Sequence, residues 1–222
     1  MKKTNKRYII WDLDGTLWTH KNHEVAIISD VLGIPFTEKF EKHFWGMIEK
    51  FNEVFADKLV VRDKVSILIE DTIPELFFYG ITGEQFLNAW QNADTNLLNE
   101  QARFVLREAV KKGYKNLVLT DWLYDRQMKQ LKDFDILKYI EKVYSCEDNY
   151  MKSNPKSVTR VVKEKKKDAY IIIGDTLKSD IAFANNTGID SIWYNPCHVK
   201  NETEFTPTYE TDNLISALYL IN

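Results

Sequence analysis

Cysteine is scarce in this sequence. The 222 residues include only Cys146 and Cys197, too few for a disulfide scaffold. A single bridge between them is one alternative, but we expect two free thiols in a reducing compartment. Hydrophobic residues make up 44% of the chain, so a packed core is expected to hold the fold together.

Long apolar runs and a strong net charge are absent as well. No stretch approaches the roughly 18 consecutive apolar residues that a membrane-spanning helix requires. The basic segment 1–7 is followed by a short apolar run that ends at Asp12 and Asp14, which is unlike a signal peptide. A formal net charge of −3 provides no electrostatic reason to bind nucleic acid or an anionic membrane. We therefore expect a soluble, cytoplasmic protein with neither of these as a partner.

The segment Tyr8–Leu17 combines a strand pattern with two carboxylates. Its apolar residues suit a strand that is buried on both faces of a parallel sheet. The strand ends at Asp12 and Asp14, followed by Gly15, and ligands of open α/β sheets bind at such strand ends. Two adjacent carboxylates repel each other, and a divalent cation such as Mg²⁺ would offset that repulsion. The alternative is an ordinary solvated turn, in which aspartate and glycine are common.

The rest of the chain predicts a doubly wound α/β fold. Helical patterns fill residues 23–92, and strands then alternate with helices. Further strands are expected at 116–119, 142–145, 170–173 and 191–194, and helices at 100–113, 124–132, 154–165, 178–186 and 213–220. This alternation indicates a Rossmann-like parallel sheet with helices on both faces. We expect a core of residues 1–18 plus 95–222 and an inserted helical bundle at 19–94.

The inserted helices carry an aromatic stripe at spacings of three and four residues. Its members are Phe40, Phe44, Met47, Ile48, Phe51 and Phe55. Such a stripe favours a bundle core over a ligand wall. The polar and aromatic candidates of the insert are likewise interpreted as structural; they are His20, His43, Asn52, Arg62 and Trp90.

Polar residues follow several of the predicted strands. They are Thr120 and Asp121, then Lys152, and finally Asp175 with Asp180 at the start of a helix. Strand ends of a parallel sheet share one edge, so these residues can converge with Asp12 and Asp14. Taken singly, Asp180 could simply cap its helix and Lys152 could be a surface lysine. Together they favour a metal cluster.

The ordered set of Asp-x-Asp-Gly-Thr, Thr, Lys and Gly-Asp-(four residues)-Asp resembles the four motifs of the haloacid dehalogenase superfamily, over almost the whole chain. The resemblance implies that Asp12 is a nucleophile and Asp14 a general acid/base. It also implies that Thr120 and Lys152 hold a phosphoryl group, with Gly15 and Asp121 as further phosphate-binding candidates. The implied Mg²⁺ ligands are Asp12, Asp14, Asp175 and Asp180.

Two details refine the resemblance. The dehalogenase branch lacks an acid at the position of Asp14, because halide leaves without a proton, so its presence favours a phosphatase. The lysine motif of many relatives is Lys-Pro-Asp-Pro, whereas this chain has Lys152-Ser153-Asn154-Pro155. Because Lys156 lies close by, either lysine could fill the phosphate-binding role.

The helical insert resembles the C1-type cap of the subfamily that contains phosphoglycolate phosphatase, sugar-phosphate mutases and nucleotidases. Trp18 and Thr19 would then begin the hinge. Segments 192–196 and 207–210 look like those of house-cleaning 5′-nucleotidases, although such residues also occur in ordinary packing. The resemblance therefore implies a Mg²⁺-dependent phosphatase for a small phosphorylated metabolite, such as a nucleoside 5′-monophosphate. A sugar phosphomutase and a catalytically silent binding protein are the alternatives.

Overall fold

The computed structural model describes residues 6–162 and 164–221. The chain divides into two compact units, Met1–Thr19 with Leu98–Asn222 and His20–Leu97. The strands β2 (Trp18–His20) and β3 (Asn96–Leu98) pair with each other and contain both points at which the chain passes between the units. That the second unit acts as a cap remains a prediction.

The first unit is built on a six-stranded sheet with the order β5-β4-β1-β6-β7-β8. All five strand pairs are parallel. The strands are β1 (Tyr8–Trp11), β4 (Lys115–Leu119), β5 (Ile140–Tyr144), β6 (Tyr170–Gly174), β7 (Asp190–Tyr194) and β8 (Tyr209–Thr211). The predicted α/β fold is confirmed, and its first strand lies at the centre of the sheet.

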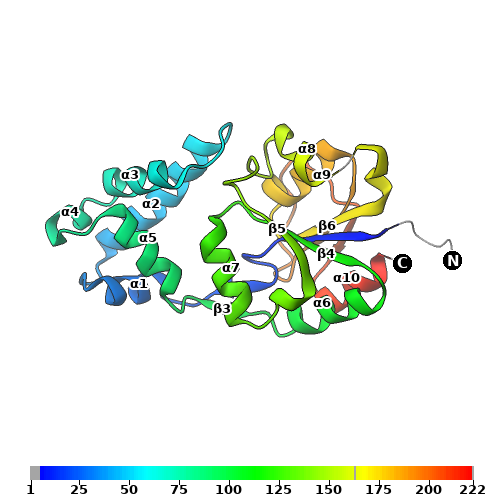
Figure 1. The fold of residues 1–222 in the computed structure, drawn as a ribbon, viewed down its shortest axis with the longest axis horizontal. Coiled ribbons are helices and arrows are strands. Elements are labelled where there is room, and N and C mark those ends of the chain that lie inside the picture. The colour runs from blue at the N-terminus through cyan, green and yellow to red at the C-terminus, as the bar shows by residue number, and fades with distance from the viewer. Residues whose placement is uncertain (1–5, 163, 222) are drawn as a thin grey trace. The chain divides into compact units, whose positions relative to one another are not determined.

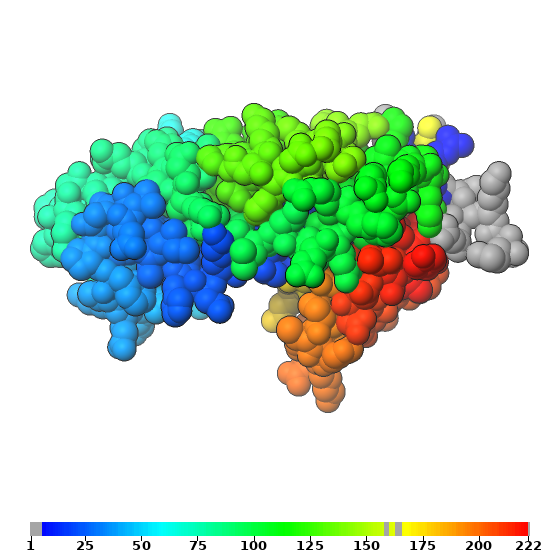
Figure 2. Space-filling model, turned by 90° about the horizontal axis from the view of Figure 1, so that it is seen from below, coloured from blue at the N-terminus to red at the C-terminus, as the bar shows by residue number. Residues whose placement is uncertain are grey.

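Helices cover both faces of this sheet (Figure 1). Ile9 and Trp11 point to the face packed by α6 (Ala102–Lys111) and α10 (Leu214–Leu220). These two helices lie side by side at the surface, in green and red (Figure 2). Ile10 points to the opposite face, where residues of α8 (Val158–Val161) and α9 (Ala182–Thr187) complete a second cluster. Because alternate side chains of β1 enter two cores, the strand is apolar throughout.

The remaining helical segments of this unit are short. They are α7 (Tyr124–Asp133), η1 (Leu137–Tyr139), η2 (Pro155–Ser157), α8 (Val158–Val161), η3 (Glu164–Ala169), η4 (Leu177–Ile181) and α9 (Ala182–Thr187). The continuous helix predicted at 154–165 is wrong: 3₁₀ segments flank the four-residue α8, and Lys163 lies outside the described residues. The Asn154 side chain accepts the backbone N–H of Lys156, and such turn contacts compete with helical hydrogen bonds.

The second unit is a bundle of α1 (Glu24–Leu32), α2 (Glu38–Phe55), α3 (Arg62–Thr72), α4 (Glu75–Tyr79) and α5 (Gly83–Asn92). Five members of the aromatic stripe are buried on α2, and Ile48 is half-buried. Phe44 packs edge-on against Trp90, with ring centroids 5.0 Å apart. The stripe therefore forms the core of the bundle, as predicted. None of the helices within residues 6–162 and 164–221 combines the length and apolarity needed to cross a membrane.

Candidate active site

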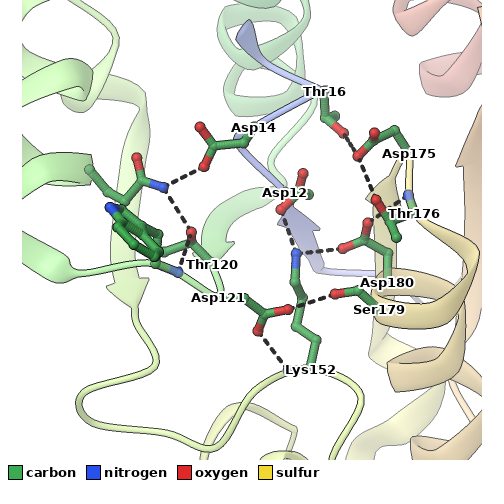
Figure 3. A network of polar contacts seen from close by, with 12 residues as sticks. Asp12, Asp14, Thr16, Thr120, Asp121, Lys152, Asp175, Thr176, Ser179 and Asp180 are labelled. Carbon is green, nitrogen blue, oxygen red and sulfur yellow. Dashed lines mark hydrogen bonds and ion pairs between the residues drawn. The ribbon is translucent and has the colours of Figure 1, made fainter. Parts of the chain in front are cut away.

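Lys152 joins the end of the central strand to the start of a distant helix (Figure 3). Asp12 directly follows β1, and Lys152 lies in the loop after β5. The Lys152 ammonium donates to Asp12 Oδ1 at 2.5 Å and to Asp180 Oδ1 at 2.7 Å. All three side chains are at most 7% exposed. Lys156, the other candidate lysine, is exposed and lies over the ring of Tyr150.

Asp121 positions the loop that carries Lys152. Its Oδ1 accepts the Lys152 backbone N–H at 2.7 Å, and its Oδ2 accepts the Ser179 hydroxyl at 2.7 Å. Both oxygens of Asp121 therefore join neighbouring protein segments. A carboxylate repels phosphate, and the phosphate-binding role of Asp121 remains a prediction.

Asp12, Asp175 and Asp180 form an acidic triad. Each contributes a carboxylate oxygen, and the three oxygens lie within 4.8 Å of one another. Asp180 belongs to the π-helical turn η4, and its Oδ2 accepts the backbone N–H of Thr176 at 3.0 Å. π-Turns recur at functional sites, and this one brings Asp180 back toward the strand end. The triad matches three of the four predicted metal ligands.

Two glycines allow the triad to close. Gly15 has a φ of 89°, and a Cβ there would lie 2.3 Å from Asp175 Oδ2. A Cβ on Gly174 would lie 2.1 Å from Asp180 Cγ. Any side chain at either position would push a carboxylate out of place. The phosphate-binding role of Gly15 remains a prediction, and the structure shows only its close approach to Asp175.

Burial dominates the electrostatics of this site. It raises the pKa of Asp12 well above its usual range, and the charges of Asp180 and Asp175 add to the shift while Lys152 opposes it. Burial and the neighbouring Asp180 raise the pKa of Asp175 to about 6. Burial by itself would lower the pKa of Lys152, but the carboxylates of Asp12, Asp180 and Asp121 outweigh it and raise that pKa well above its usual range. One ammonium thus faces a surplus of negative charge.

The donor set suits a hard divalent cation. Three carboxylates converge on one place and, within the part of the chain that the structure describes, share only one ammonium, that of Lys152. A divalent cation beside the triad would remove the repulsion that raises the pKa values of Asp12 and Asp175. Oxygen ligands of this kind favour Mg²⁺. The residues present therefore fit the predicted metal.

Asp14 lies outside the triad and faces other partners (Figure 3). Its Oδ1 accepts the Trp18 indole N–H at 2.8 Å, and its Oδ2 accepts the Gln127 amide at 2.5 Å. The same amide nitrogen donates to Thr120 Oγ1 at 3.0 Å. Arg126 Nη1 lies 3.9 Å from Asp14 Oδ1. The role of Asp14 as a metal ligand remains a prediction.

Gln127 is a site residue that sequence reasoning missed. It lies in the first turn of α7, the helix that follows β4 and Thr120. A polar residue in the first turn after such a strand is the signal that was available. Glutamine is so common on helix surfaces that the signal was weak. Only the structure shows Gln127 to be fully buried.

The order and convergence of these motifs agree with a comparison of the whole chain. The family model for haloacid dehalogenase-like hydrolases matches residues 9–194. The chain belongs to this family. The predicted resemblance is thereby confirmed, and the protein is a haloacid dehalogenase-like hydrolase.

Individual relatives extend this comparison. Pyrimidine 5′-nucleotidase PynA of Streptococcus pneumoniae is 54% identical over 44 residues, which cover 20% of this chain and 19% of PynA. The HAD-hydrolase YfnB of Bacillus subtilis is 22% identical over 229 residues, covering 98% of this chain and 97% of YfnB. The match to PynA is thus local, whereas the match to YfnB spans both chains.

Solved structures share the fold. The magnesium-bound crystal structure of YfnB matches with a TM-score of 0.73 at 19% identity, over 98% of this chain and 99% of YfnB. A 2-haloacid dehalogenase from Pseudomonas syringae pv. Tomato DC3000 matches with a TM-score of 0.67 at 22% identity, over 97% of each chain. Since a dehalogenase shares this fold, the reaction has to be argued from the site.

Proposed function

We propose that this hydrolase is a Mg²⁺-dependent phosphatase that acts on small phosphomonoesters through an aspartyl-phosphate on Asp12. The observation that carries the proposal is the buried contact of Lys152 with Asp12 and Asp180, two members of the acidic triad. Phosphoryl transfer concentrates negative charge on the transferring oxygens. A nucleophile, an ammonium and a metal-ligating cluster at one strand end are the groups that this reaction requires.

In the first step, a carboxylate oxygen of Asp12 attacks the phosphorus, and the bond from phosphorus to the ester oxygen breaks. Asp14 donates its proton to that oxygen, which leaves as an alcohol. Lys152 and the Thr120 hydroxyl offset the charge of the transferring group. Asp12, Asp175 and Asp180 would hold Mg²⁺, and the bound ion would supply further charge compensation.

In the second step, water attacks the phosphorus of the aspartyl-phosphate. The ionised Asp14 takes a proton from this water, and the acyl-phosphate bond to Asp12 breaks. Inorganic phosphate leaves, while Asp12 is again a carboxylate and Asp14 again carries a proton. A dehalogenase has no need for this acid, because halide departs unprotonated. The presence of Asp14 therefore supports a phosphatase.

Within the phosphomonoesters, we propose nucleoside 5′-monophosphates, and pyrimidine nucleotides in particular. The local match to PynA supports this choice, as does the resemblance of segments 192–196 and 207–210 to house-cleaning nucleotidases. A phosphate-release screen over nucleotides, sugar phosphates and phosphoglycolate tests it. Turnover of sugar phosphates or phosphoglycolate with none of nucleotides would exclude the nucleotide assignment while leaving the phosphatase intact.

Hydrolysis of p-nitrophenyl phosphate by Asp12→Asn tests the reaction itself. Removal of the nucleophile is expected to lower kcat by about 10³-fold or more, and EDTA is expected to abolish wild-type turnover until Mg²⁺ is restored. Asp190→Asn is the matched control, because Asp190 pairs with Lys6 at the opposite end of the sheet. Equal turnover by Asp12→Asn and Asp190→Asn would overturn the proposed mechanism.

A further inference from the structure

The Gln127 side chain links two groups of the proposed reaction that come from different strands. Its Nε2 donates one hydrogen bond to Asp14 Oδ2 at 2.5 Å and another to Thr120 Oγ1 at 3.0 Å. Both hydrogens of the amide nitrogen are therefore used. The amide cannot be turned around, because its oxygen would then face the carboxylate of Asp14. The orientation of Gln127 is fixed by its two acceptors.

A buried glutamine that only filled space at this position would be energetically unfavourable. Gln127 is 0% exposed, and its Oε1 is buried without a hydrogen-bond donor among the residues that the structure describes. An unsatisfied buried carbonyl oxygen typically destabilises a protein by about 1–3 kcal/mol. A methionine or leucine would fill the same space without that cost. The amide is therefore better explained by what its nitrogen holds.

The bond to Thr120 determines the direction of the threonine hydroxyl. Thr120 Oγ1 accepts from Gln127 Nε2 and also from the Trp122 backbone N–H at 3.2 Å. A hydroxyl oxygen has two lone pairs and one hydrogen. With both lone pairs used, Thr120 can interact with a further group only as a donor. Thr120 is thereby prepared to donate to an anionic oxygen such as that of phosphate.

Asp14 is held in a similar way from two sides. Gln127 holds its Oδ2, and the indole of Trp18 donates to its Oδ1 at 2.8 Å. Trp18 is fully buried, and its ring packs against Phe134 at a centroid distance of 5.7 Å. The two donors lie on separate segments, so the carboxylate is restrained in both position and rotation.

We propose that Gln127 is a positioning residue of the reaction: its amide holds the acid/base Asp14 and turns the Thr120 hydroxyl toward the phosphoryl group, while Trp18 completes the hold on Asp14. The proposal rests on the proposed phosphatase function. Gln127 is assigned an effect on both Asp14 and Thr120, whereas Trp18 is assigned an effect on Asp14 alone. This difference allows the two residues to be separated by experiment.

Two esters with different leaving groups can be used to measure how well Asp14 is positioned as a general acid. Phenyl phosphate and p-nitrophenyl phosphate are similar in size, but phenolate is the more basic leaving group and depends more on protonation by a general acid. The value of kcat/KM reports the transfer to Asp12, the step in which the leaving group departs. The ratio of kcat/KM for the two esters therefore measures how well Asp14 is placed. Competitive inhibition by inorganic phosphate measures the hold of Thr120 on the anion.

The test compares Gln127→Met and Trp18→Phe with Gln130→Met. Methionine keeps the length of glutamine but has no donor. Gln130 lies on the same helix and is also buried, and it makes no hydrogen bond to Asp14 or Thr120 within residues 6–162 and 164–221. Gln127→Met is expected to lower the ratio of kcat/KM for phenyl phosphate to kcat/KM for p-nitrophenyl phosphate by about tenfold. It is also expected to weaken competitive inhibition by inorganic phosphate several-fold. Trp18→Phe is expected to lower the ratio alone, and Gln130→Met to change neither.

A Gln127→Met variant that matches Gln130→Met in both measurements would overturn the proposal, since wild-type turnover shows that the phosphatase function holds. If the wild type releases no phosphate from any ester, the proposed phosphatase function is wrong. Thermal unfolding then tests the contact between Gln127 and Asp14 without any measurement of activity. Gln127→Met and Asp14→Ala are then combined. A double variant whose loss in Tm is smaller than the sum of the single losses supports the hold on Asp14, whereas additive losses overturn it.

Discussion

In the sheet-containing unit, the carboxylates of Asp12, Asp175 and Asp180 converge around one ammonium, Lys152. In the helical unit, several buried and half-buried charges are instead paired. His43 Nδ1 contacts Glu75 at 2.8 Å. Arg62 pairs with Glu84 at 3.1 Å. The buried Glu24 accepts the Trp90 indole N–H at 2.9 Å with one carboxylate oxygen. Its other oxygen lies 3.2 Å from His20 Nδ1.

The two units therefore differ in whether their buried charges are balanced, and the proposed reaction groups lie in the unbalanced set. Paired groups satisfy each other and leave little capacity for a ligand, whereas a surplus of buried negative charge is stable only with a cation or a proton. His43, Arg62 and Trp90 were predicted to be structural, and their contacts agree with that interpretation. The charge imbalance thus lies with the predicted motifs and not with the insert.

The strongest contrast between the units comes from a matched pair of glycines. Gly174→Ala would place a Cβ 2.1 Å from Asp180 Cγ, and Gly83→Ala in the helical unit would place one 2.1 Å from Ser66 O. Both should lower the free energy of unfolding, by about 1–3 kcal/mol. Only Gly174→Ala should also lower kcat, by about 10²-fold or more, because it displaces Asp180, a proposed metal ligand. Thermal unfolding and hydrolysis of p-nitrophenyl phosphate measure the two effects.

Comparable losses of kcat in the two glycine variants would contradict the division between the units. A Gly174→Ala variant with full activity would show that Asp180 need not approach the strand end so closely.

A second contrast concerns the affinity for Mg²⁺. This affinity should depend on pH because the proposed ligands lie in the sheet-containing unit. Because the pKa of Asp175 is raised to about 6, its contribution to stability without metal is complete below about pH 4 and is lost as pH rises through about 6. Mg²⁺ needs the ionised form. Its affinity should therefore weaken by about tenfold for each pH unit below 6, and the rise in Tm on adding Mg²⁺ should be larger at about pH 7.5 than at about pH 5.

Asp175→Asn provides the control for this titration and is expected to reduce the dependence of the Tm shift on pH, while Asp12, whose pKa is also raised, still titrates. Equal rises in Tm at both pH values in the wild type would refute the link between Asp175 and the metal.

The smallest expected effect is that of Trp90→Phe in the helical unit. The change removes the indole N–H that Glu24 accepts while retaining an aromatic ring next to Phe44. Because Glu24 is 5% exposed, the loss should lower the free energy of unfolding by about 1–2 kcal/mol. The kcat for p-nitrophenyl phosphate should change by less than about threefold, since no reacting group is moved. A large loss of kcat at unchanged Tm would assign Trp90 to the reaction instead.

Much of the fold followed from local patterns. The apolar segments ending at Trp11, Leu119 and Ile173 were expected as buried strands, and the structure makes them neighbours in one parallel sheet. The short strands β2, β3 and β8 have three residues each, too few for an alternating pattern to be recognised. The helix predicted at 154–165 failed because hydrophobic spacing does not reveal a competing turn contact.

Part of the candidate site could likewise be predicted from local patterns, and part could not. Asp12, Lys152 and Asp180 were expected at one sheet edge because parallel strand ends share that edge. The partners of Asp14 were not expected, since the Trp18 indole and the Gln127 amide are placed by packing between segments that are 109 positions apart in the sequence. Periodicity describes which side of an element faces the core, but it does not describe which rotamer a buried side chain adopts there.

The sequence by itself determined the class of fold, the central strand and the residue types that gather at its end. These depend on hydrophobic periodicity and on the shared edge of parallel strands, both of which can be read locally. Tertiary structure alone decided that Lys152 and not Lys156 reaches Asp12, that Gly15 and Gly174 make room for carboxylates, and that Gln127 joins Asp14 to Thr120. Each of these is a matter of a few ångströms between distant segments, and such distances are set by the packing of the whole unit.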